Sequence, residues 1–327
     1  MNTTVTSIIK LYKRKRYPLF LFLMLSYGTI HREKSAKKEL RVLPNVIQRS
    51  LTLDDIPDLV ALSKEVDWPD YNAEELTSLL TNGHFTGFTT TDGQVISCAG
   101  LFQYDSVASI GAVIVSETHR GLGLARQMID TLLRHSDQSV PVVLTATVQG
   151  QPVYEKIGFQ TAGYIHTYKA QKTNPSALHP SHQIHLFPAD ETHLPSIERL
   201  DEKGAGTNRS NFLIKRMERA AFKLIAKDEH HEITGFAFGV ETPANLMIGP
   251  LAANDEQTAL ALIQSLLTSY SGAFRIDMQE ETAERLHASL VEAGFTKTNV
   301  AHFMVIRGNE KQNDPALLYF LASQAFS

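Results

Sequence analysis

The stretch Ser109-Ile-Gly-Ala-Val-Ile-Val-Ser-Glu-Thr-His-Arg-Gly-Leu-Gly-Leu-Ala-Arg-Gln-Met-Ile-Asp-Thr-Leu-Leu133 decides how the first half of this chain folds. Its first residues are apolar and mostly β-branched, which predicts a buried strand over residues 110–115. Its last residues place apolar side chains on one face of a helix that begins near Leu124. Between the strand and the helix lies a short polar turn that contains Gly121 and Gly123.

This polar turn is suited to hold a pyrophosphate group. Glycine lets the backbone come close to a bulky anion, and the N–H groups at a helix start carry partial positive charge. Two common phosphate loops do not fit. Arg126 stands where a dinucleotide fingerprint needs its third glycine, and no Gly-Lys-Ser/Thr triplet follows Gly123. An ordinary tight turn before a helix is the alternative interpretation.

The turn resembles the acetyl-CoA loop of the GNAT superfamily of N-acyltransferases. The signature of that family is Gln/Arg-x-x-Gly-x-Gly/Ala, and Arg120, Gly123 and Ala125 match it. As in the family, the loop follows a predicted strand and opens a predicted helix. Because Gly-x-Gly turns before helices are common, the assignment needs a second motif.

That second motif lies about one helix and one strand further along the chain. The segment Val153-Tyr-Glu-Lys-Ile-Gly-Phe159 resembles the family's Tyr that is followed four residues later by Gly-Phe. Residues 142–147 supply the predicted strand between the two motifs. In the family, this strand and the strand before the loop splay apart, and the acyl group and pantetheine arm of the cofactor lie in the gap.

The resemblance implies an N-acetyltransferase that uses acetyl-CoA as co-substrate and no metal. An amine would attack the thioester directly, and Tyr154 would protonate the leaving thiolate as general acid. The alternative for Tyr154 is a ring packed in the core with its hydroxyl in water. A backbone N–H of the loop-bearing strand would polarise the thioester oxygen. The residues expected to contact the cofactor are Val113, Ile114, Val115, Arg120, Gly121, Leu122, Gly123, Leu124, Ala125, Arg126, Thr147 and Tyr154.

The sequence identifies no general base. Asp105 and Glu117 lie near the loop-bearing strand, but a chain of water molecules serves as well. The family often has Asn where this chain has Thr147. This difference affects one hydrogen bond to the pantetheine arm. Trp68 lies in a region that borders the acceptor pocket in the family, either as a lid or as a half-buried anchor of its loop.

Two GNAT-like domains follow from the resemblance, each a mixed, mostly antiparallel twisted sheet flanked by helices, in the α/β (α+β) class. Residues 46–170 have the element order of the catalytic domain, and residues 157–168 are expected to close it with a strand pair. Residues 171–182 are polar and contain proline, which predicts a linker. Residues 183–307 are expected to form a divergent second domain.

This second domain looks like a degraded copy of the first. Met247-Ile-Gly-Pro-Leu251 parallels the start of the loop-bearing strand, and Leu290-Val-Glu-Ala-Gly-Phe295 matches the Tyr154 motif position for position. At the place of the pyrophosphate loop stands Asp255-Glu-Gln-Thr258, which has no glycine and would repel an anion. The pattern resembles a tandem GNAT family whose divergent second domain lacks the CoA loop. Such a domain would shape the acceptor site or stabilise the first domain.

Composition agrees with a globular enzyme of two domains. The chain has 327 residues, 43% of them hydrophobic, and a net charge of −4, which gives no reason to expect nucleic acid. Its one cysteine, Cys98, lies in a predicted strand and is expected to be a small buried apolar residue. The sequence does not identify the amine acceptor, although a small molecule is slightly favoured over a protein. The oligomeric state is not readable.

The two ends of the chain are the least typical parts. A basic segment and an apolar run fall within residues 1–45, which we expect to be a flexible or dispensable extension. A membrane-proximal anchor and an uncleaved signal are the alternatives. Because acetyl-CoA is a cytosolic substrate, we expect a cytoplasmic protein. Residues 308–327 are predicted to form a tail helix. A non-catalytic acyl-CoA-binding module and a membrane-associated interaction protein are the competing functions.

Overall fold

The computed structural model describes residues 45–180, 184–308, 314 and 316–326. The predicted extension of residues 1–45 therefore lies outside the described residues, apart from Asn45. From Asn45 onward the chain forms one unit, in which two successive α/β halves follow one another as the sequence predicts. In the described ranges, no helix is both long and apolar enough to cross a membrane.

The first half contains the loop-bearing strand and the Tyr154 motif. Its helices pack into two different hydrophobic clusters, with α3 and α4 in one and α5 in the other, as expected for the two faces of one sheet. Its elements are β1 (Val46–Ser50), α3 (Ile56–Glu65), α4 (Ala73–Asn82), β2 (His84–Thr90), β3 (Val95–Gln103), β4 (Ala108–Val115), α5 (Leu124–His135), β5 (Val142–Ala146), α6 (Gln151–Ile157) and β6 (Gln160–Ala170).

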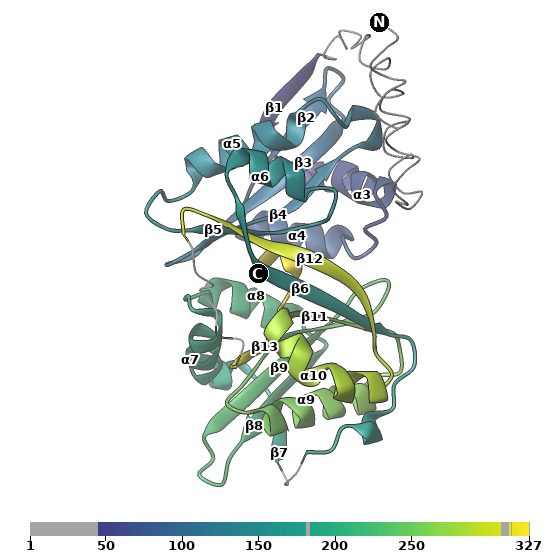
Figure 1. Ribbon diagram of the computed structural model, residues 1–327, viewed down its shortest axis with the longest axis vertical. Helices are drawn as coiled ribbons and strands as arrows, with labels where there is room; N and C mark the ends of the chain where they lie inside the picture. The colour runs from purple at the N-terminus through teal and green to yellow at the C-terminus, as the bar shows by residue number, and fades with distance from the viewer. Residues whose placement is uncertain (1–44, 181–183, 309–313, 315, 327) are drawn as a thin grey trace, which may run out of the picture. The chain divides into compact units, whose positions relative to one another are not determined.

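The second half repeats this order of strands and helices (Figure 1). A short 3-10 turn, Pro175–Ala177, lies in the predicted linker, where Gln264 donates hydrogen bonds to the carbonyls of Pro175 and Leu178. The elements are β7 (His185–Pro188), α7 (Leu194–Ala205), α8 (Ser210–Arg219), β8 (Phe222–Lys227), β9 (Ile233–Glu241), β10 (Leu246–Ala253), α9 (Glu256–Ser269), β11 (Phe274–Gln279), α10 (Glu280–Glu292), β12 (Thr296–Ile306) and β13 (Leu318–Phe320).

The two halves exchange their last long strands. The sheet runs in the order β1-β2-β3-β4-β5-β12-β6-β11-β10-β9-β8-β7. Strand β5 of the first half pairs with β12 of the second, and β11 of the second half pairs with β6 of the first. In Figure 1, β6 and β12 lie side by side between the other strands of the two halves. Each half therefore needs the other to complete its sheet.

This exchange corrects the expected strand pair at residues 157–168. The chain has one strand there, β6, and its antiparallel partner β12 comes from the far end of the second half. Both strands are 11 residues long, and each has a neighbour on both sides. Strand β6 lies between β11 and β12, and β12 lies between β5 and β6. Local sequence cannot distinguish a neighbouring partner from a remote one, because both satisfy the same backbone groups.

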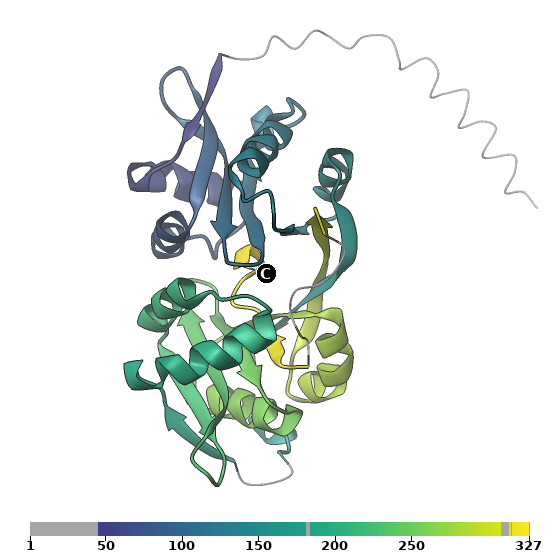
Figure 2. The ribbon, with the colours of Figure 1, turned by 90° about the vertical axis from the view of Figure 1, so that its left-hand side faces the viewer.

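The predicted tail helix over residues 308–327 is wrong for the part of the tail that the structure describes. Leu318–Phe320 form β13, which pairs with β10, and Gln324–Phe326 form a short 3-10 turn. All three residues of β13 are buried, whereas a surface helix would bury one face only. Figure 2 shows this C-terminal segment between the strands of the first half and those of the second. The tail forms a strand instead of a helix because the free edge of β10 offers it backbone partners.

A buried arginine joins the tail to the second half. Arg216 Nε donates to the carbonyl of Gly249 at 3.0 Å, and Arg216 Nη2 donates to the carbonyl of Ala322 at 2.8 Å. Gly249 has a φ of 153° and lies directly against the tail, so a Cβ atom there would overlap the carbonyl oxygen of Leu321. The tail therefore packs where only glycine fits.

Replacing Gly249 tests this packing. We expect Gly249→Ala to lower the free energy of unfolding by about 2–4 kcal/mol, because it adds overpacking to backbone strain. Gly93→Ala is the control, since Gly93 also has a positive φ, of 94°, but no atom lies within 4 Å of its added Cβ. Its loss should be about 1 kcal/mol. Urea unfolding followed by the fluorescence of the single tryptophan, Trp68, measures both; equal losses would contradict the tail packing.

Candidate active site

The site begins where β4 and β5 separate. The two strands pair in parallel only from Ala108–Val142 to Ile110–Leu144, and beyond that point they diverge. The divergence leaves a cleft of about 660 Å³, lined by both strands, the glycine turn and α6. Along this cleft β4 has no β5 partner, so a ligand can pair with its backbone as a strand would.

A bulge in β4 helps to open the cleft. Cys98 pairs with Ile114 while Gly100 pairs with Gly111, so β4 has one more residue than β3 between these pairs. Ala112 lies in the bulge with a φ of 52°, an unusual value for a residue other than glycine. Bulges bend and twist a strand locally, which directs this part of β4 away from β5.

The glycine turn ends at the positive end of a helix dipole. Gly121 and Gly123 both have a φ of 79°, a left-handed conformation that glycine adopts at little cost. Gly123 is the residue before α5, so no side chain caps the first N–H groups, and no acidic residue lies in the first turn. Leu124 is buried and anchors the helix on the core. The turn therefore presents backbone N–H groups to the cleft without a competing carboxylate.

Two arginines flank this turn. Arg120 Nη1 contacts Glu117 Oε1 at 3.1 Å, and Arg120 Nε donates to the carbonyl of Val115 at 3.4 Å. Arg126 lies in the first turn of α5 and contacts Asp130 at 3.7 Å. Both side chains are about half exposed and line the cleft, so both can reorient toward an anion.

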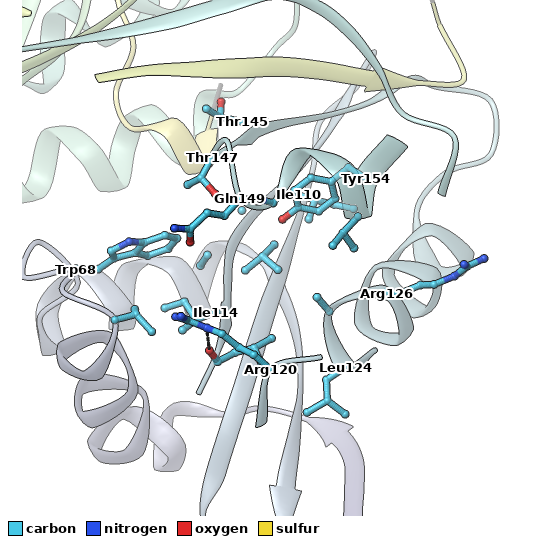
Figure 3. Close-up of a pocket in the computed structure, with 18 of the residues that line it drawn as sticks. Trp68, Ile110, Ile114, Arg120, Leu124, Arg126, Thr145, Thr147, Gln149 and Tyr154 are labelled. Carbon is cyan, nitrogen blue, oxygen red and sulfur yellow. Dashed lines mark hydrogen bonds between the residues drawn. The ribbon is translucent and has the colours of Figure 1, made fainter. Parts of the chain in front are cut away.

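Tyr154 lies across the cleft from the glycine turn. It is 7% exposed, and its ring packs edge-on against Phe159 with the ring centroids 6.0 Å apart. Its hydroxyl points into the cleft (Figure 3). Burial raises the pKa of this hydroxyl above its usual value, so the group stays protonated at neutral pH. A protonated hydroxyl in this position can donate to a ligand.

The structure brings together nearly all residues that the sequence predicts to contact the cofactor. Eleven of these predicted residues line the cleft: Val113, Ile114, Val115, Arg120, Gly121, Gly123, Leu124, Ala125, Arg126, Thr147 and Tyr154. Leu122 is not among the lining residues, because its side chain packs against the hydrophobic cluster under α5. Local pattern predicts the turn correctly but does not show which way each of its side chains points.

Other lining residues were not predicted as binding residues. Trp68 and Tyr71 come from the loop between α3 and α4, and the sequence allows Trp68 to be either a lid or an anchor of this loop. Gln149 follows β5, and Gln324 and Ala325 come from the C-terminal tail. The tail residues lie about 200 positions from β4 in sequence, so no spacing could have found them.

The candidate bases do not reach the cleft. Asp105 is exposed, Glu117 is bound to Arg120, and neither lines the cleft. Among the residues that the structure shows around the cleft, none is Asp or Glu. The described ranges also contain no group of three His, Cys, Asp or Glu residues that could hold a metal ion.

The corresponding place in the second half is occupied by the chain itself. Asp255 caps α9 by accepting a hydrogen bond from the Thr258 N–H at 2.8 Å, which places a carboxylate where the first half has glycine. Between β10 and β11 lies β13, and the Leu321 N–H donates to the Asp277 carbonyl on β11 at 2.8 Å. Pro250 also removes one backbone donor from the β10 bulge. Among the described residues, chain therefore lies in the gap of the second half that corresponds to the cleft of the first.

Models of known families match both halves. The Acetyltransferase (GNAT) family matches residues 53–159, and the Acetyltransferase (GNAT) domain matches residues 197–320. The chain is also 34% identical over 244 residues to the uncharacterized N-acetyltransferase YitH of Bacillus subtilis (strain 168). That match covers 75% of this chain and 86% of the relative.

Solved structures have the same fold at lower identity. A proposed acetyltransferase of Pyrococcus horikoshii superposes with a TM-score of 0.71 at 20% identity, over 90% of this chain and 100% of that one. A tandem GNAT protein from the clavulanic acid biosynthesis pathway superposes with a TM-score of 0.60 at 11% identity, over 80% and 98%. At these identities the likeness concerns the fold alone.

Cys98 provides a chemical test of the packing of β3 against β4. Its thiol is fully buried and donates to the Ala112 carbonyl at 3.2 Å, and burial raises its pKa to about 12. We expect iodoacetamide at pH 8 to alkylate Cys98 about 10³-fold more slowly in the native protein than in concentrated urea, because thiolate is the reactive form. Mass spectrometry measures the rate. Fast labelling of the native protein would contradict the burial of this thiol.

Proposed function

Since the chain belongs to the GNAT acetyltransferase family, we propose that it transfers the acetyl group of acetyl-CoA to a primary amine, in the cleft of the first half. The observation that carries this proposal is the free edge of β4 next to an uncapped helix start. We further propose a small-molecule acceptor and a cytoplasmic location, where acetyl-CoA is available.

The cleft offers a place for each part of the cofactor. The pyrophosphate would lie on the N–H groups of the Gly121–Gly123 turn, with Arg120 and Arg126 beside it. The pantetheine arm would pair with the β4 edge along Val113–Val115, and Thr147 would face it from the end of β5. Polar groups along a mostly apolar cleft are what a long, flexible cofactor with a charged end requires.

The chemistry then needs few side chains. The neutral amine nitrogen attacks the thioester carbonyl carbon, and a backbone N–H near Val113–Val115 stabilises the oxyanion. When the C–S bond breaks, the thiolate takes a proton from the Tyr154 hydroxyl, which burial keeps protonated. The ammonium proton of the acceptor passes to water, because no described carboxylate lines the cleft. Water then restores the proton on Tyr154.

The second half would take no cofactor in this scheme. Its helix start is capped by Asp255, and β13 lies in the gap between its diverging strands. We therefore expect one molecule of acetyl-CoA per chain.

Calorimetric titration of the full chain with acetyl-CoA tests the proposal. The unmodified protein should bind with 1:1 stoichiometry. Gly123→Glu should weaken binding at least about 10-fold more than Gly123→Gln, which is about 1.4 kcal/mol, because both strain the backbone but only glutamate repels the pyrophosphate. Absence of binding to the unmodified protein would overturn the proposal. A stoichiometry near two would show that the second half also binds acetyl-CoA.

Replacing Tyr154 separates chemistry from binding. We expect Tyr154→Phe to lower kcat about 10²-fold while the Kd for acetyl-CoA changes less than about 2-fold, because the hydroxyl acts on the leaving thiolate. Tyr168→Phe is the control, since Tyr168 is also buried but its hydroxyl bonds to His287 at 2.9 Å, outside the cleft. Initial rates of CoA release measure kcat. Equal effects of the two variants would assign Tyr154 to packing.

A further inference from the structure

One end of the cleft remains after the cofactor is placed. The glycine turn and the two arginines form the phosphate end, and Tyr154 lies along the middle. The opposite end is lined by Trp68, Tyr71, Gln149 and two tail residues. In Figure 3, Trp68 and Gln149 lie together, on the other side of the drawn lining residues from Arg126. An acceptor that reaches the thioester must therefore enter against this end.

This end presents a preformed aromatic surface. The rings of Trp68 and Tyr71 are stacked, with centroids 5.4 Å apart and planes inclined by 29°. Two hydrogen bonds hold their loop. The backbone N–H of Trp68 donates to the Ser63 carbonyl at 2.9 Å, and the Ser63 hydroxyl donates to the Tyr71 carbonyl at 3.0 Å. Stacked rings with a fixed backbone favour a flat apolar ligand, because little side-chain entropy is lost on binding.

The charges around the cleft restrict the acceptor further. The cationic groups among its lining residues are Arg120, Arg126, Lys156 and His119, which lie in the glycine turn, its neighbouring turns and α6. Gln149 and Gln324 add side-chain amides to the aromatic end. No described lining residue is acidic, so an acceptor with a second ammonium group would find no counterion. The side chains that form the aromatic end, Trp68, Tyr71, Gln149, Gln324 and Ala325, likewise include no cation to pair with a carboxylate.

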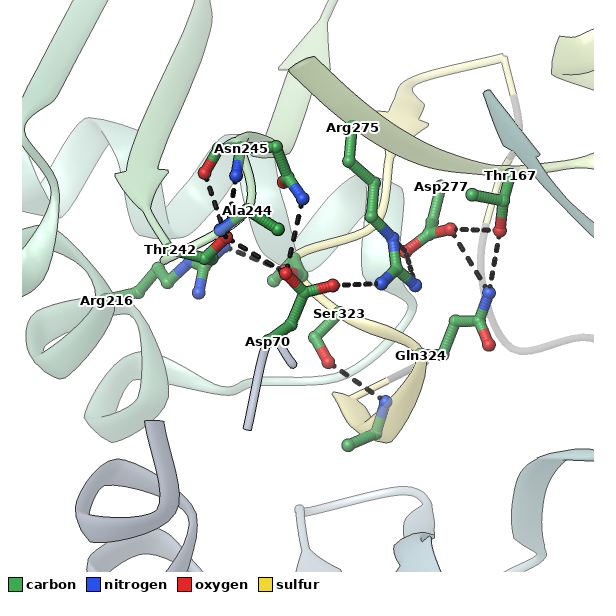
Figure 4. A network of polar contacts seen from close by, with 12 residues as sticks. Asp70, Thr167, Arg216, Thr242, Ala244, Asn245, Arg275, Asp277, Ser323 and Gln324 are labelled. Atoms are coloured by element: carbon green, nitrogen blue, oxygen red, sulfur yellow. Dashed lines mark hydrogen bonds and ion pairs between the residues drawn. The ribbon is translucent and has the colours of Figure 1, made fainter. Parts of the chain in front are cut away.

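The second half holds the Trp68 loop on one side of this end and Gln324 on the other through a series of polar contacts (Figure 4). Arg275 Nη1 donates to Asp70 Oδ2 at 2.7 Å, which ties the Trp68 loop to β11. Arg275 Nη2 contacts Asp277 Oδ2 at 2.9 Å. Asp277 Oδ1 in turn accepts from Gln324 Nε2 at 3.1 Å and from the Thr167 hydroxyl at 2.5 Å.

The chain of contacts is largely shielded from water. The Arg275 and Asp70 side chains are 18% and 16% exposed, and Asp277 is 1% exposed. The pKa of Arg275 is raised although burial opposes its charge, because Asp277 and Asp70 both stabilise the guanidinium. Removing Arg275 would leave Asp70 and Asp277 without the cation that they share, while Thr242 and Asn245 would still donate to Asp70 Oδ1.

Resting on the proposed function, we propose that the acceptor is a primary amine with a flat, uncharged aromatic body that stacks on the Trp68–Tyr71 pair. Arg275 of the second half positions this pair through Asp70, and its partner Asp277 holds the opposing Gln324. The substrate class is therefore that of arylalkylamines, and the second half serves as part of the acceptor site without binding cofactor.

Four amines that differ in the group attached to the amino nitrogen test the substrate class in the full-length protein with saturating acetyl-CoA. Phenethylamine has the flat ring, 2-cyclohexylethylamine has similar size without flatness, L-phenylalanine adds a carboxylate, and spermidine adds cations. We expect kcat/KM for phenethylamine to exceed each of the others at least about 10-fold, as one well-placed aromatic contact allows. Equal or higher values for any of the other three amines, or no turnover of phenethylamine, would overturn the substrate class.

A second readout does not depend on turnover. Trp68 is the single tryptophan of the chain, so its fluorescence reports directly on the proposed surface. In the presence of CoA, phenethylamine should produce a saturable change in this fluorescence, and 2-cyclohexylethylamine should produce none. No change with phenethylamine would overturn the inference. If acetyl-CoA itself fails to bind in calorimetry, the proposed function fails instead, so the two failures are distinguishable.

Arg275 is tested by comparison with another ion pair between the halves. We expect Arg275→Met to raise the KM for phenethylamine about 10-fold with kcat and acetyl-CoA Kd nearly unchanged, and Arg275→Lys to restore part of the loss. The control is Arg219→Met, because Arg219 Nη1 also pairs across the halves, with Glu75 at 2.8 Å, but lies outside the cleft. A similar KM change in Arg219→Met, or unchanged KM in Arg275→Met, would contradict the positioning role.

Discussion

The exchange of β6 and β12 is the constraint on which the rest of the structure depends. Strand β5 of the first half would have an open edge without β12, and β11 of the second half would have one without β6. Open edges leave backbone groups unpaired and invite association with other chains. The halves are therefore one folding unit. The exchange also brings β11, with Arg275 and Asp277, to the neighbourhood of the first half's cleft.

The two halves use the same strand divergence in opposite ways. In the first, β4 and β5 separate around an open cleft; in the second, β13 lies between β10 and β11. Gly111 and Gly249 occupy matching places at the two bulges, and the tail packs closely against both. A segment of chain thus completes the second half and continues to Gln324 and Ala325, which line the open cleft. The same tail therefore fills the gap in the second half and lines the cleft that we propose as the acceptor site.

Most elements of the first half could be predicted because their signals are local. The hairpin around Asp92-Gly93, the apolar face that begins at Leu124 and the helix end at Gly158 each depend on a few neighbouring residues. The tail shows where such signals fail. The spacing of Leu317, Leu318 and Leu321 suits a helix, yet the exposed edge of β10 binds this segment as a strand. Tertiary context overrides propensity when a free edge is available.

Contiguous residues suffice to identify the two-fold repeat, the glycine turn, the Tyr154 motif and the lack of that turn in the second copy. Only the tertiary structure decided which strands pair, where the tail lies and which side chains face the cleft. Strand pairing satisfies backbone groups that are alike in every residue, so sequence specifies it weakly. The Asp70–Arg275–Asp277–Gln324 chain joins residues up to 205 positions apart, and only folding brings such groups within hydrogen-bond distance.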